Sequence, residues 1–232
     1  MQAARTKVQG YSIVEIPSLT GRAYLVHGEK GSILIDGLTR RHGKRILKTA
    51  TQTAADIHSK VSLILITHAH IDHYGGAQYL KGKLGAPIAI HELDADDMRR
   101  GRNGTLCPRN LSESILKLSL SRLRTEPTEP DIVLEGEAGD LRDYGIEAKW
   151  VWTPGHSEGS ISVVFPGEIA IVGDLIIGRF GFSRKAAYPL WVKDVRQLRE
   201  SIRRVMDFGP KILFSGHGGP FSSEEVRRVF FR

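Results

Sequence analysis

Apolar residues along this chain occur in short runs separated by glycine, proline and polar turn residues. Runs of this kind, rich in β-branched residues, predict strands. The predicted strands span 11–16, 23–27, 32–36, 61–66, 87–91, 132–134, 147–152, 160–165, 169–172 and 211–214. Apolar positions at helical spacing predict helices over 40–59, 75–84, 194–208 and from Ser222 onward. Strand clusters interleaved with helices predict two sheets packed face to face and covered outside by helices.

One segment, residues 92–130, departs from the strand pattern. Its apolar residues have helical spacing at Leu111, Ile115, Leu118 and Leu123. Two prolines, Pro127 and Pro130, end the pattern. The segment is either a surface helix that covers the core or a cap that shapes a substrate site. Because no linker or repeat interrupts the apolar runs, we expect a single domain over 1–232 with this helical cap inserted at 92–130.

Potential metal ligands crowd into the segment 67–76, which reads THAHIDHYGG and directly follows the apolar run 61–66. The ligand-type residues in it are His68, His70, Asp72 and His73. Imidazole and carboxylate groups crowded at the end of a buried strand lose hydration and gain little in return unless they hold a cation. The segment therefore predicts a metal site.

Three more candidate ligands follow apolar runs and adjoin glycines: His156, Asp174 and His217. A glycine beside a ligand allows a sharp turn or a close approach of the backbone to an ion. A lone histidine is more often structural than functional. This set of histidine and aspartate residues, with open spacing between its members, is instead typical of a catalytic metal centre.

The order and spacing of these residues resemble the metallo-β-lactamase-fold superfamily, in its dinuclear metallohydrolase branch. The motif is His68-x-His70-x-Asp72-His73, followed by His156, Asp174 and His217. The segments 23–26 and 32–37 also resemble the first hairpin of that fold. The resemblance implies an α/β (α+β) fold with four αββα layers, similar to glyoxalase II and to lactonases. We expect no glutathione-binding C-terminal extension, because the chain ends fifteen residues after His217.

The resemblance also implies the ligand assignment. One metal ion takes His68, His70 and His156, the other takes Asp72, His73 and His217, and Asp174 bridges the two. Two such ions share a hydroxide and stabilise the charge that develops in the transition state. Ligands without thiolate suit zinc, although iron and manganese also fit. Asp72 is expected to be catalytic as well, orienting the hydroxide and carrying a proton to the leaving group.

Other residues near the motif are assigned supporting roles. Asp36, at the end of an early strand, is expected to brace the ligand loop, the alternative being a plain turn residue at the strand end. Histidines outside the ligand motifs are expected to be structural or at the surface: His27, His42, His58 and His91.

The loop 178–188 follows the predicted bridging aspartate and carries cations, aromatic rings and a phenol. Four of its residues are expected to contact an anionic or acyl substrate: Arg179, Arg184, Lys185 and Tyr188. In this interpretation the tyrosine donates a hydrogen bond to an oxyanion. The alternative is a solvated loop in which Phe180 and Phe182 are buried.

The formal net charge of +7 and the pI of about 9.6 favour anionic partners. The cations are scattered pairs, so a small-molecule substrate is expected rather than nucleic acid, and homo-oligomerisation is left open. A single cysteine, Cys107, excludes an intramolecular disulfide and suits a reducing compartment. No signal-peptide pattern and no apolar stretch of roughly 18 residues is present, so a cytoplasmic protein without a membrane partner is expected.

Three functions stay open at this point. The first is hydrolysis of small esters, thioesters or lactones by a dinuclear centre with a bridging hydroxide. The second is a phosphodiesterase, phosphoesterase or nuclease, which the basic charge and a two-metal centre favour. The third is a sulfur dioxygenase with one iron ion held by His68, His70 and a further ligand. The complete second set of ligands disfavours that third function.

Overall fold

The computed structural model describes residues 4–8, 10–57, 60–108 and 110–231. His58, which was expected to be structural, lies outside the described residues. Within them, seven strands form the first sheet in the order β1-β2-β3-β4-β5-β6-β7. These strands are β1 (Ala4–Val8), β2 (Tyr11–Pro17), β3 (Arg22–His27), β4 (Ser32–Ile35), β5 (Val61–Leu65), β6 (Ile88–His91) and β7 (Ile132–Leu134).

The second sheet of the described chain has six strands in the order β15-β14-β11-β10-β9-β8, and a small third sheet pairs β12 with β13. These strands are β8 (Ala138–Asp140), β9 (Lys149–Trp152), β10 (Ile161–Phe165), β11 (Ile169–Ile171), β12 (Ile177–Gly178), β13 (Ala186–Ala187), β14 (Ile212–Phe214) and β15 (Phe221–Ser222). The α-helices are α1 (Gly43–Ile57), α2 (Ile71–Tyr74), α3 (Ala77–Leu84), α4 (Glu92–Arg99), α5 (Leu111–Leu120), α6 (Val195–Asp207) and α7 (Ser223–Phe230). Short 3-10 turns are η1 (Arg40–His42), η2 (Arg142–Tyr144) and η3 (Arg179–Gly181).

Neighbouring residues of the central strands pack on opposite faces of their sheets, because side chains alternate along a strand. In β4, Ile33 and Ile35 pack between the two sheets, whereas Leu34 packs with residues of α1 and α3. In β10, Val163 packs between the sheets and Val164 packs with residues of α6 and α7. Most buried apolar residues of the described chain thus fall in three clusters, one between the sheets and one beneath each helical layer.

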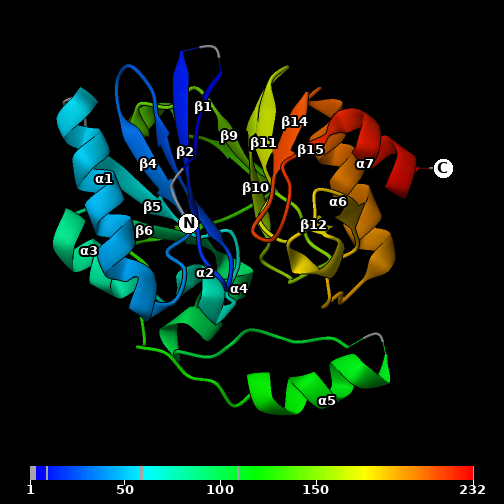
Figure 1. Cartoon of the computed structure of the whole chain (residues 1–232). Coiled ribbons are helices and arrows are strands. Elements are labelled where there is room, and N and C mark those ends of the chain that lie inside the picture. Colours follow the sequence, from blue (N-terminus) through cyan, green and yellow to red (C-terminus); the bar gives the residue numbers. More distant parts are fainter. Residues whose placement is uncertain (1–3, 9, 58–59, 109, 232) are drawn as a thin grey trace.

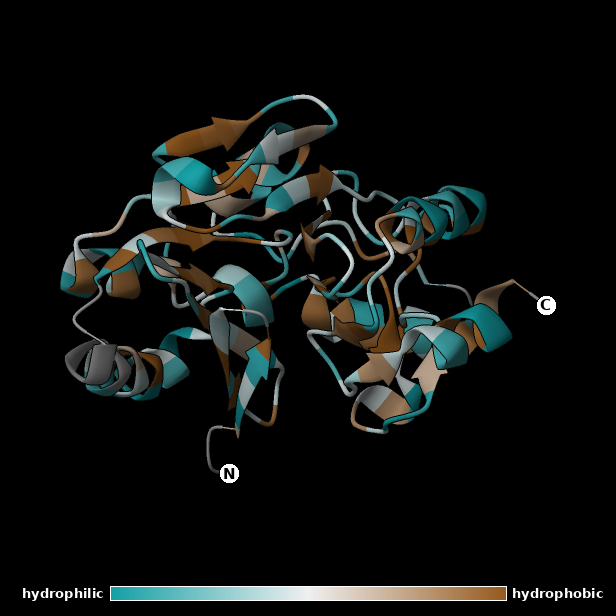
Figure 2. Cartoon of the chain, turned by 90° about the horizontal axis from the view of Figure 1, so that it is seen from above, coloured by the Kyte–Doolittle hydropathy of each residue, from teal (hydrophilic) through white to brown (hydrophobic). Residues whose placement is uncertain are grey.

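Figure 1 shows the resulting layers: α1 with α3, the first sheet, the second sheet, and α6 with α7. Seen from above, apolar residues concentrate in the strands of the interior, and polar residues dominate the helices outside (Figure 2). In α6, Leu198, Ile202 and Val205 recur at helical spacing on the buried side. The predicted αββα sandwich is confirmed.

The carboxyl ends of several strands meet at one edge of the sandwich. Strands β4, β5 and β6 are parallel, so their ends lie side by side. In the second sheet, β11 is parallel to β14, and β9 runs the same way because both β9 and β11 are antiparallel to β10. The loops after β5, β9, β11 and β14 carry the candidate ligands, so the fold itself brings them together.

Some elements lack a clear sequence signal, and the pattern predicts no strand at β1, β8, β12, β13 or β15. The edge strand β1 is largely exposed, so it carries no apolar run. The others are only two or three residues long. The helix predicted at 75–84 corresponds to α3, which begins at Ala77, and the single turn α2 that precedes Gly75 and Gly76 was not predicted. The helix predicted at 40–59 begins with the turn η1.

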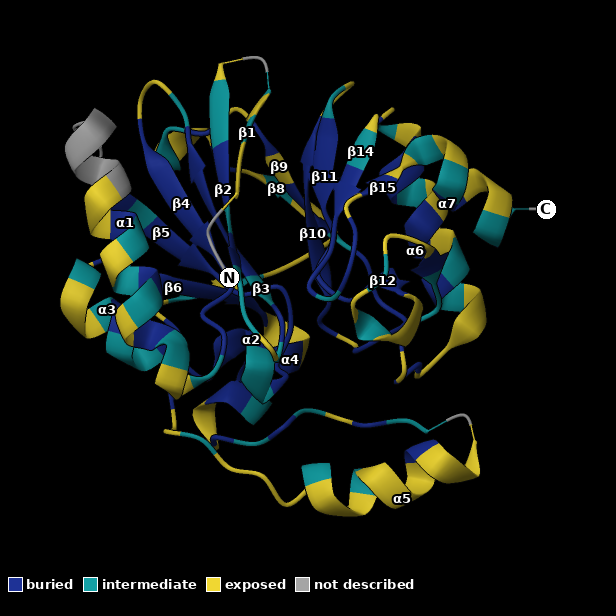
Figure 3. Cartoon of the chain, in the orientation of Figure 1, coloured by how far each residue is buried: buried dark blue, intermediate teal, exposed yellow. Residues whose placement is uncertain are grey.

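The segment 92–130 consists of two different parts. Helix α4 belongs to the layers, since Ala95 and Met98 are buried in the cluster beneath α1 and α3. Residues 103–108 and 110–123, here called the α5 arm, extend away from the layers, and α5 is mostly exposed (Figure 3). A single β-bridge between Arg102 and Arg124 closes the base of the arm.

No helix within the described ranges is long and apolar enough to cross a membrane.

The three described histidines outside the ligand motifs have local partners, as expected of structural residues. Nδ1 of His27 lies 2.6 Å from Ser32 Oγ, and Nδ1 of His42 lies 2.8 Å from Thr39 Oγ1. Nε2 of His91 lies 3.1 Å from the carbonyl oxygen of Gly136, and its ring stacks on Trp152 with centroids 5.9 Å apart.

Candidate metal centre

Four of the candidate ligands come from the short segment between β5 and α3. His68 and His70 lie in the loop after β5, and His70 is also the N-cap of α2. Asp72 and His73 lie in the single turn of α2, so their side chains leave the helix in different directions. One segment thus presents ligands to two adjacent points.

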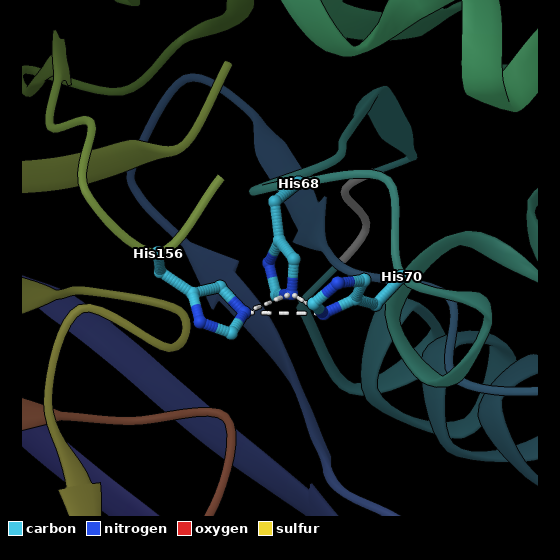
Figure 4. Close-up of side chains that lie close together, drawn as sticks. All are labelled: His68, His70 and His156. Carbon is cyan, nitrogen blue, oxygen red and sulfur yellow. Dashed lines mark hydrogen bonds between the residues drawn. The ribbon is translucent and has the colours of Figure 1, made fainter. Parts of the chain in front are cut away.

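The first group of ligands consists of His68, His70 and His156, whose rings point toward one another (Figure 4). Nε2 of His68 lies 3.1 Å from Nδ1 of His70, and Nε2 of His156 lies 3.3 Å and 3.1 Å from these two atoms. Donor atoms about 2.05 Å from a tetrahedral ion stand about 3.3 Å apart. The spacing of the three nitrogens therefore fits a single metal ion.

The second group consists of Asp72, His73 and His217. Nε2 of His217 lies 3.3 Å from Oδ2 of Asp72 and 3.3 Å from Oδ2 of Asp174. A third grouping, of His68, His73 and Asp174, connects the first two. The seven predicted ligand residues are therefore all brought together at one centre within the described chain.

Two buried atoms at this centre indicate that a cation belongs there. His73 Nε2 and Asp174 Oδ1 have no hydrogen-bond partner among the described residues, although they lie only 3.5 Å apart. A buried polar atom without a partner destabilises the fold. A metal ion between an imidazole nitrogen and a carboxylate oxygen would satisfy both, so the residues present fit metal binding.

The protonation of the two groups differs. Burial lowers the pKa of His68 well below its usual value and that of His70 to about 3, so the first group is neutral at pH 7. Burial alone would also lower the pKa of His73, but the carboxylates of Asp174 and Asp36 raise it well above its usual value. The pKa of His217 is raised in the same way, by Asp174 and Asp72 against the effect of burial.

The predicted role of Asp36 in bracing the ligand loop is confirmed. Its carboxylate accepts hydrogen bonds from the backbone N–H of Thr67 at 2.8 Å and from the Thr67 hydroxyl. Its Oδ2 also lies 2.8 Å from Nδ1 of His73, which directs Nε2 of that ring toward the metal centre. Asp36 has a φ of 65°, an uncommon conformation for a residue with a side chain.

A second supporting carboxylate, that of Asp94 in α4, was not predicted. It accepts hydrogen bonds of 2.8 Å from the Ala69 backbone, from the Ser157 hydroxyl and from the Gly159 backbone. Asp94 thus ties the loop that carries His68 and His70 to the loop that carries His156. Burial raises the pKa of Asp94, although these hydrogen bonds oppose the effect. The sequence signal that could have indicated this role is an acidic residue between the apolar residues Leu93 and Ala95 of the helix.

Glycine at position 216 is required by close packing at the centre. A Cβ atom there would lie 2.4 Å from Asp174 Oδ1 and 2.5 Å from His73 Cε1. Any other residue would displace one of these two side chains. The predicted role of glycines beside ligands therefore holds at this position.

A cavity of about 700 Å³ lies against the centre and is bordered by residues of both ligand groups. Its apolar lining comes from Ile71, Leu106, Leu120, Ile177 and Trp191 inside and from Leu19, Leu123, Phe180, Phe182 and Leu190 at more exposed positions. Leu120 and Leu123 belong to the α5 arm, so the arm forms one wall of the cavity.

The four residues expected to contact substrate are not among the residues that line this cavity. Arg179, Arg184 and Lys185 are exposed to solvent, and the ring of Tyr188 packs on Phe230 with centroids 4.8 Å apart. The alternative expectation, that Phe180 and Phe182 are buried, is wrong: they are 75% and 76% exposed. Their rings border the cavity instead.

Comparison with known proteins agrees with this geometry. A family model described as the metallo-beta-lactamase superfamily matches residues 18–217. The chain belongs to this superfamily. It is 27% identical over 216 residues to a probable metallo-hydrolase of Methanocaldococcus jannaschii, which covers 91% of both chains. The chain is thus a member of a family of metal-dependent hydrolases, with clusters of histidine and aspartate able to bind metal ions.

Two further relatives are informative. The atrochrysone carboxyl ACP thioesterase of Aspergillus fumigatus is 26% identical over 166 residues, which cover 71% of this chain and 41% of that protein. A solved metallo-beta-lactamase from Pontibacter korlensis has a TM-score of 0.65 and 18% identity, over 97% of this chain and 95% of that chain. The second likeness concerns the fold alone.

Asp94→Asn should weaken metal binding, because the substitution replaces an anionic acceptor of three hydrogen bonds between two ligand loops. We expect an unfolding free energy lower by about 1–3 kcal/mol and fewer metal equivalents after dialysis. Denaturant unfolding and elemental analysis measure the two effects. Asp96→Asn is the matched control, since Asp96 is an exposed residue of the same helix. Equal metal retention in both variants would contradict the role of Asp94.

The second group should lose its metal at a higher pH than the first. Protons compete for His73 and His217 up to their raised pKa values, whereas the pKa values of His68 and His70 are lowered, so protons compete there only at lower pH. Equilibrium dialysis against zinc between pH 8 and pH 5 can compare His217→Ala, which retains the first group, with His156→Ala, which retains the second. His217→Ala should hold zinc to the lower pH, and the opposite order would refute the assignment.

Proposed function

We propose that this protein is a dinuclear metallohydrolase that cleaves small ester, thioester or lactone substrates. The observation that carries the proposal is the position of Asp174 between the two ligand groups. Its Oδ2 lies 3.3 Å from Nε2 of His217 and 3.9 Å from Nε2 of His156. One carboxylate oxygen thus faces ligands of both groups, which supports a bridging role.

Two divalent ions would be held by the groups described above, with Asp174 shared between them. The first ion would take His68, His70 and His156, and the second Asp72, His73 and His217. Imidazole and carboxylate ligands without thiolate favour zinc, while iron and manganese are chemically suited as well. Bound ions of this kind supply an activated water at neutral pH and polarise the bond to be cleaved.

Asp72 is proposed as the catalytic residue. It borders the cavity, so its carboxylate is within reach of a substrate. Burial would raise its pKa, but the hydrogen bond with His217 and the charges of His73 and His217 lower it to about 2. Asp72 is therefore ionised at neutral pH, and its carboxylate can accept the hydrogen bond that orients a water. Its proposed second role, passing a proton to the leaving group, needs its pKa to rise during turnover, because a carboxylate of such low pKa is a weak base.

The cavity lining supports an acyl substrate over a phosphate ester. Among the described lining residues, Arg22 is the only lysine or arginine. Its Nε already donates to Glu15 at 2.7 Å, so it offers little charge to a phosphate. An apolar lining suits the hydrocarbon part of an ester, lactone or thioester. The name of the related ACP thioesterase is consistent with this class, although this chain spans less than half of that protein.

A phosphodiesterase is the second candidate, because the net charge is +7 and a two-metal centre suits phosphoryl transfer. The iron-dependent sulfur dioxygenase is less consistent with the site, because Asp72, His73 and His217 complete a second ligand group. A protein that retains one iron ion and hydrolyses no ester would favour the dioxygenase.

Asp174→Ala should reduce the content of both metal ions together, whereas Asp72→Ala should mainly reduce turnover. The first substitution removes the ligand that both ions share. The second removes one ligand of the second ion, which keeps His73, His217 and Asp174, together with the catalytic carboxylate, so the main effect is a loss of about 10²–10⁴-fold in kcat. Elemental analysis and ester hydrolysis measure both, with Asp96→Asn as the control. Full metal content and full activity in Asp174→Ala would refute the dinuclear mechanism.

Neutral acyl substrates should be cleaved with a higher kcat/KM than phosphodiesters. A panel of p-nitrophenyl esters, lactones, thioesters and phosphodiesters, measured at low and high salt, separates the candidates. Turnover of a neutral ester should change little with salt, because no charge attraction assists its binding. A clear preference for phosphodiesters that falls steeply with salt would favour the phosphodiesterase.

A further inference from the structure

The cavity opens at a ring of exposed apolar side chains, here called the cavity mouth. It consists of Leu19, Leu123, Phe180, Phe182 and Leu190, which all border the cavity and are between 47% and 87% exposed. Large apolar side chains gathered at one exposed place commonly mark an interaction surface. They come from the β2–β3 turn, the α5 arm and the segment around η3, so no single element explains the grouping.

Exposed cations lie next to these residues in the chain. They are Arg122 and Arg124 beside Leu123, Arg179 beside Phe180, and Arg184 and Lys185 after Phe182. Within the described ranges none of these five forms an ion pair with a carboxylate: Arg124 donates to backbone carbonyls, and Arg179 lies 5.1 Å from the centre of the Phe180 ring. The segments 114–125 and 175–193 contain no aspartate or glutamate.

From this juxtaposition we propose that the cavity mouth docks on an anionic lipid bilayer. Aromatic and leucine side chains enter the boundary between head groups and acyl chains, and the flanking arginines and lysine contact lipid phosphates. The earlier expectation of no membrane partner rested on the lack of a spanning segment, and surface docking needs none. This inference does not depend on the reaction proposed above.

Charge favours a bilayer over a second copy of the chain. A two-fold contact through the mouth would place the same patch opposite itself and bring its five cations close to the five of the partner. Like charges at such a contact disfavour association. Nucleic acid would neutralise the charge and could stack a base on Phe180 or Phe182. The other three mouth residues are leucines, which offer no ring for stacking but suit the apolar part of a bilayer.

Co-sedimentation of the 232-residue chain with vesicles tests the proposal. We expect binding to vesicles of phosphatidylglycerol with phosphatidylcholine, weakening as salt rises, and little binding to phosphatidylcholine alone. The double variant Arg184→Glu with Lys185→Glu should bind at least about tenfold more weakly. Phe180→Ser with Phe182→Ser should also weaken binding, at constant net charge.

The matched control is Lys44→Glu with Lys48→Glu, which changes the net charge equally through exposed residues of α1. It should retain most of the binding. Because the mouth residues are exposed, the variants are expected to fold, and unchanged thermal unfolding checks this. A second measurement uses Phe182→Trp, whose fluorescence should be quenched by brominated lipids more than that of the unmodified protein.

Several results would overturn the proposal. Absence of binding to anionic vesicles at low salt is one, and equal losses in the mouth and control variants is another. A concentration-dependent dimer that Phe180→Ser with Phe182→Ser dissociates would assign the mouth to a second copy. Displacement of the protein from vesicles by polyuridylate, with tighter binding to polyuridylate alone, would assign it to nucleic acid.

Discussion

The carboxylate of Asp94 joins the two loops that supply the first ligand group, one from each sheet, and the geometry of the site depends on this connection. The first sheet supplies His68 and His70, and the second supplies His156, so the first ligand group exists only if the two sheets keep a fixed register at this edge. Apolar packing between the sheets fixes the distance between them. It does little to stop one sheet from sliding over the other, because apolar contacts have no preferred direction. The hydrogen bonds that Asp94 accepts from both loops are directional, and together with the bond from the Ile161 N–H to the Thr67 carbonyl they fix the register.

Much of this fold could be predicted from the sequence, because successive residues of the central strands pack into different layers. Ile33, Leu34 and Ile35 alternate between two packing surfaces, which is what a strand buried on both faces requires. The seven ligand residues were also recognisable, because each follows an apolar run, and the structure brings them together. Their binding of two metal ions stays a prediction.

What the chain did not reveal depends on contacts between distant segments. Asp94 is one acidic residue among several in α4, and only its burial against Ala69 and Gly159 distinguishes it. The sequence showed that the loop after Asp174 combines cations with aromatic residues. It did not show which of these side chains point toward the cavity. Phe180 and Phe182 face the opening, and the cations beside them do not enter it.

The α5 arm leaves and rejoins the layers at one bridge, between Arg102 and Arg124, and it contributes Leu120 and Leu123 to the cavity wall without supplying a metal ligand. Asn103 and Gly104 at the start of the arm contact Ile71 and His70 of the ligand segment, but beyond them the chemistry and the shape of the pocket are encoded in separable parts of the chain. Recombination at this bridge can exchange the arm for one of different length or composition. Evolution, or a protein engineer, can then alter substrate choice while the ligand set is inherited unchanged.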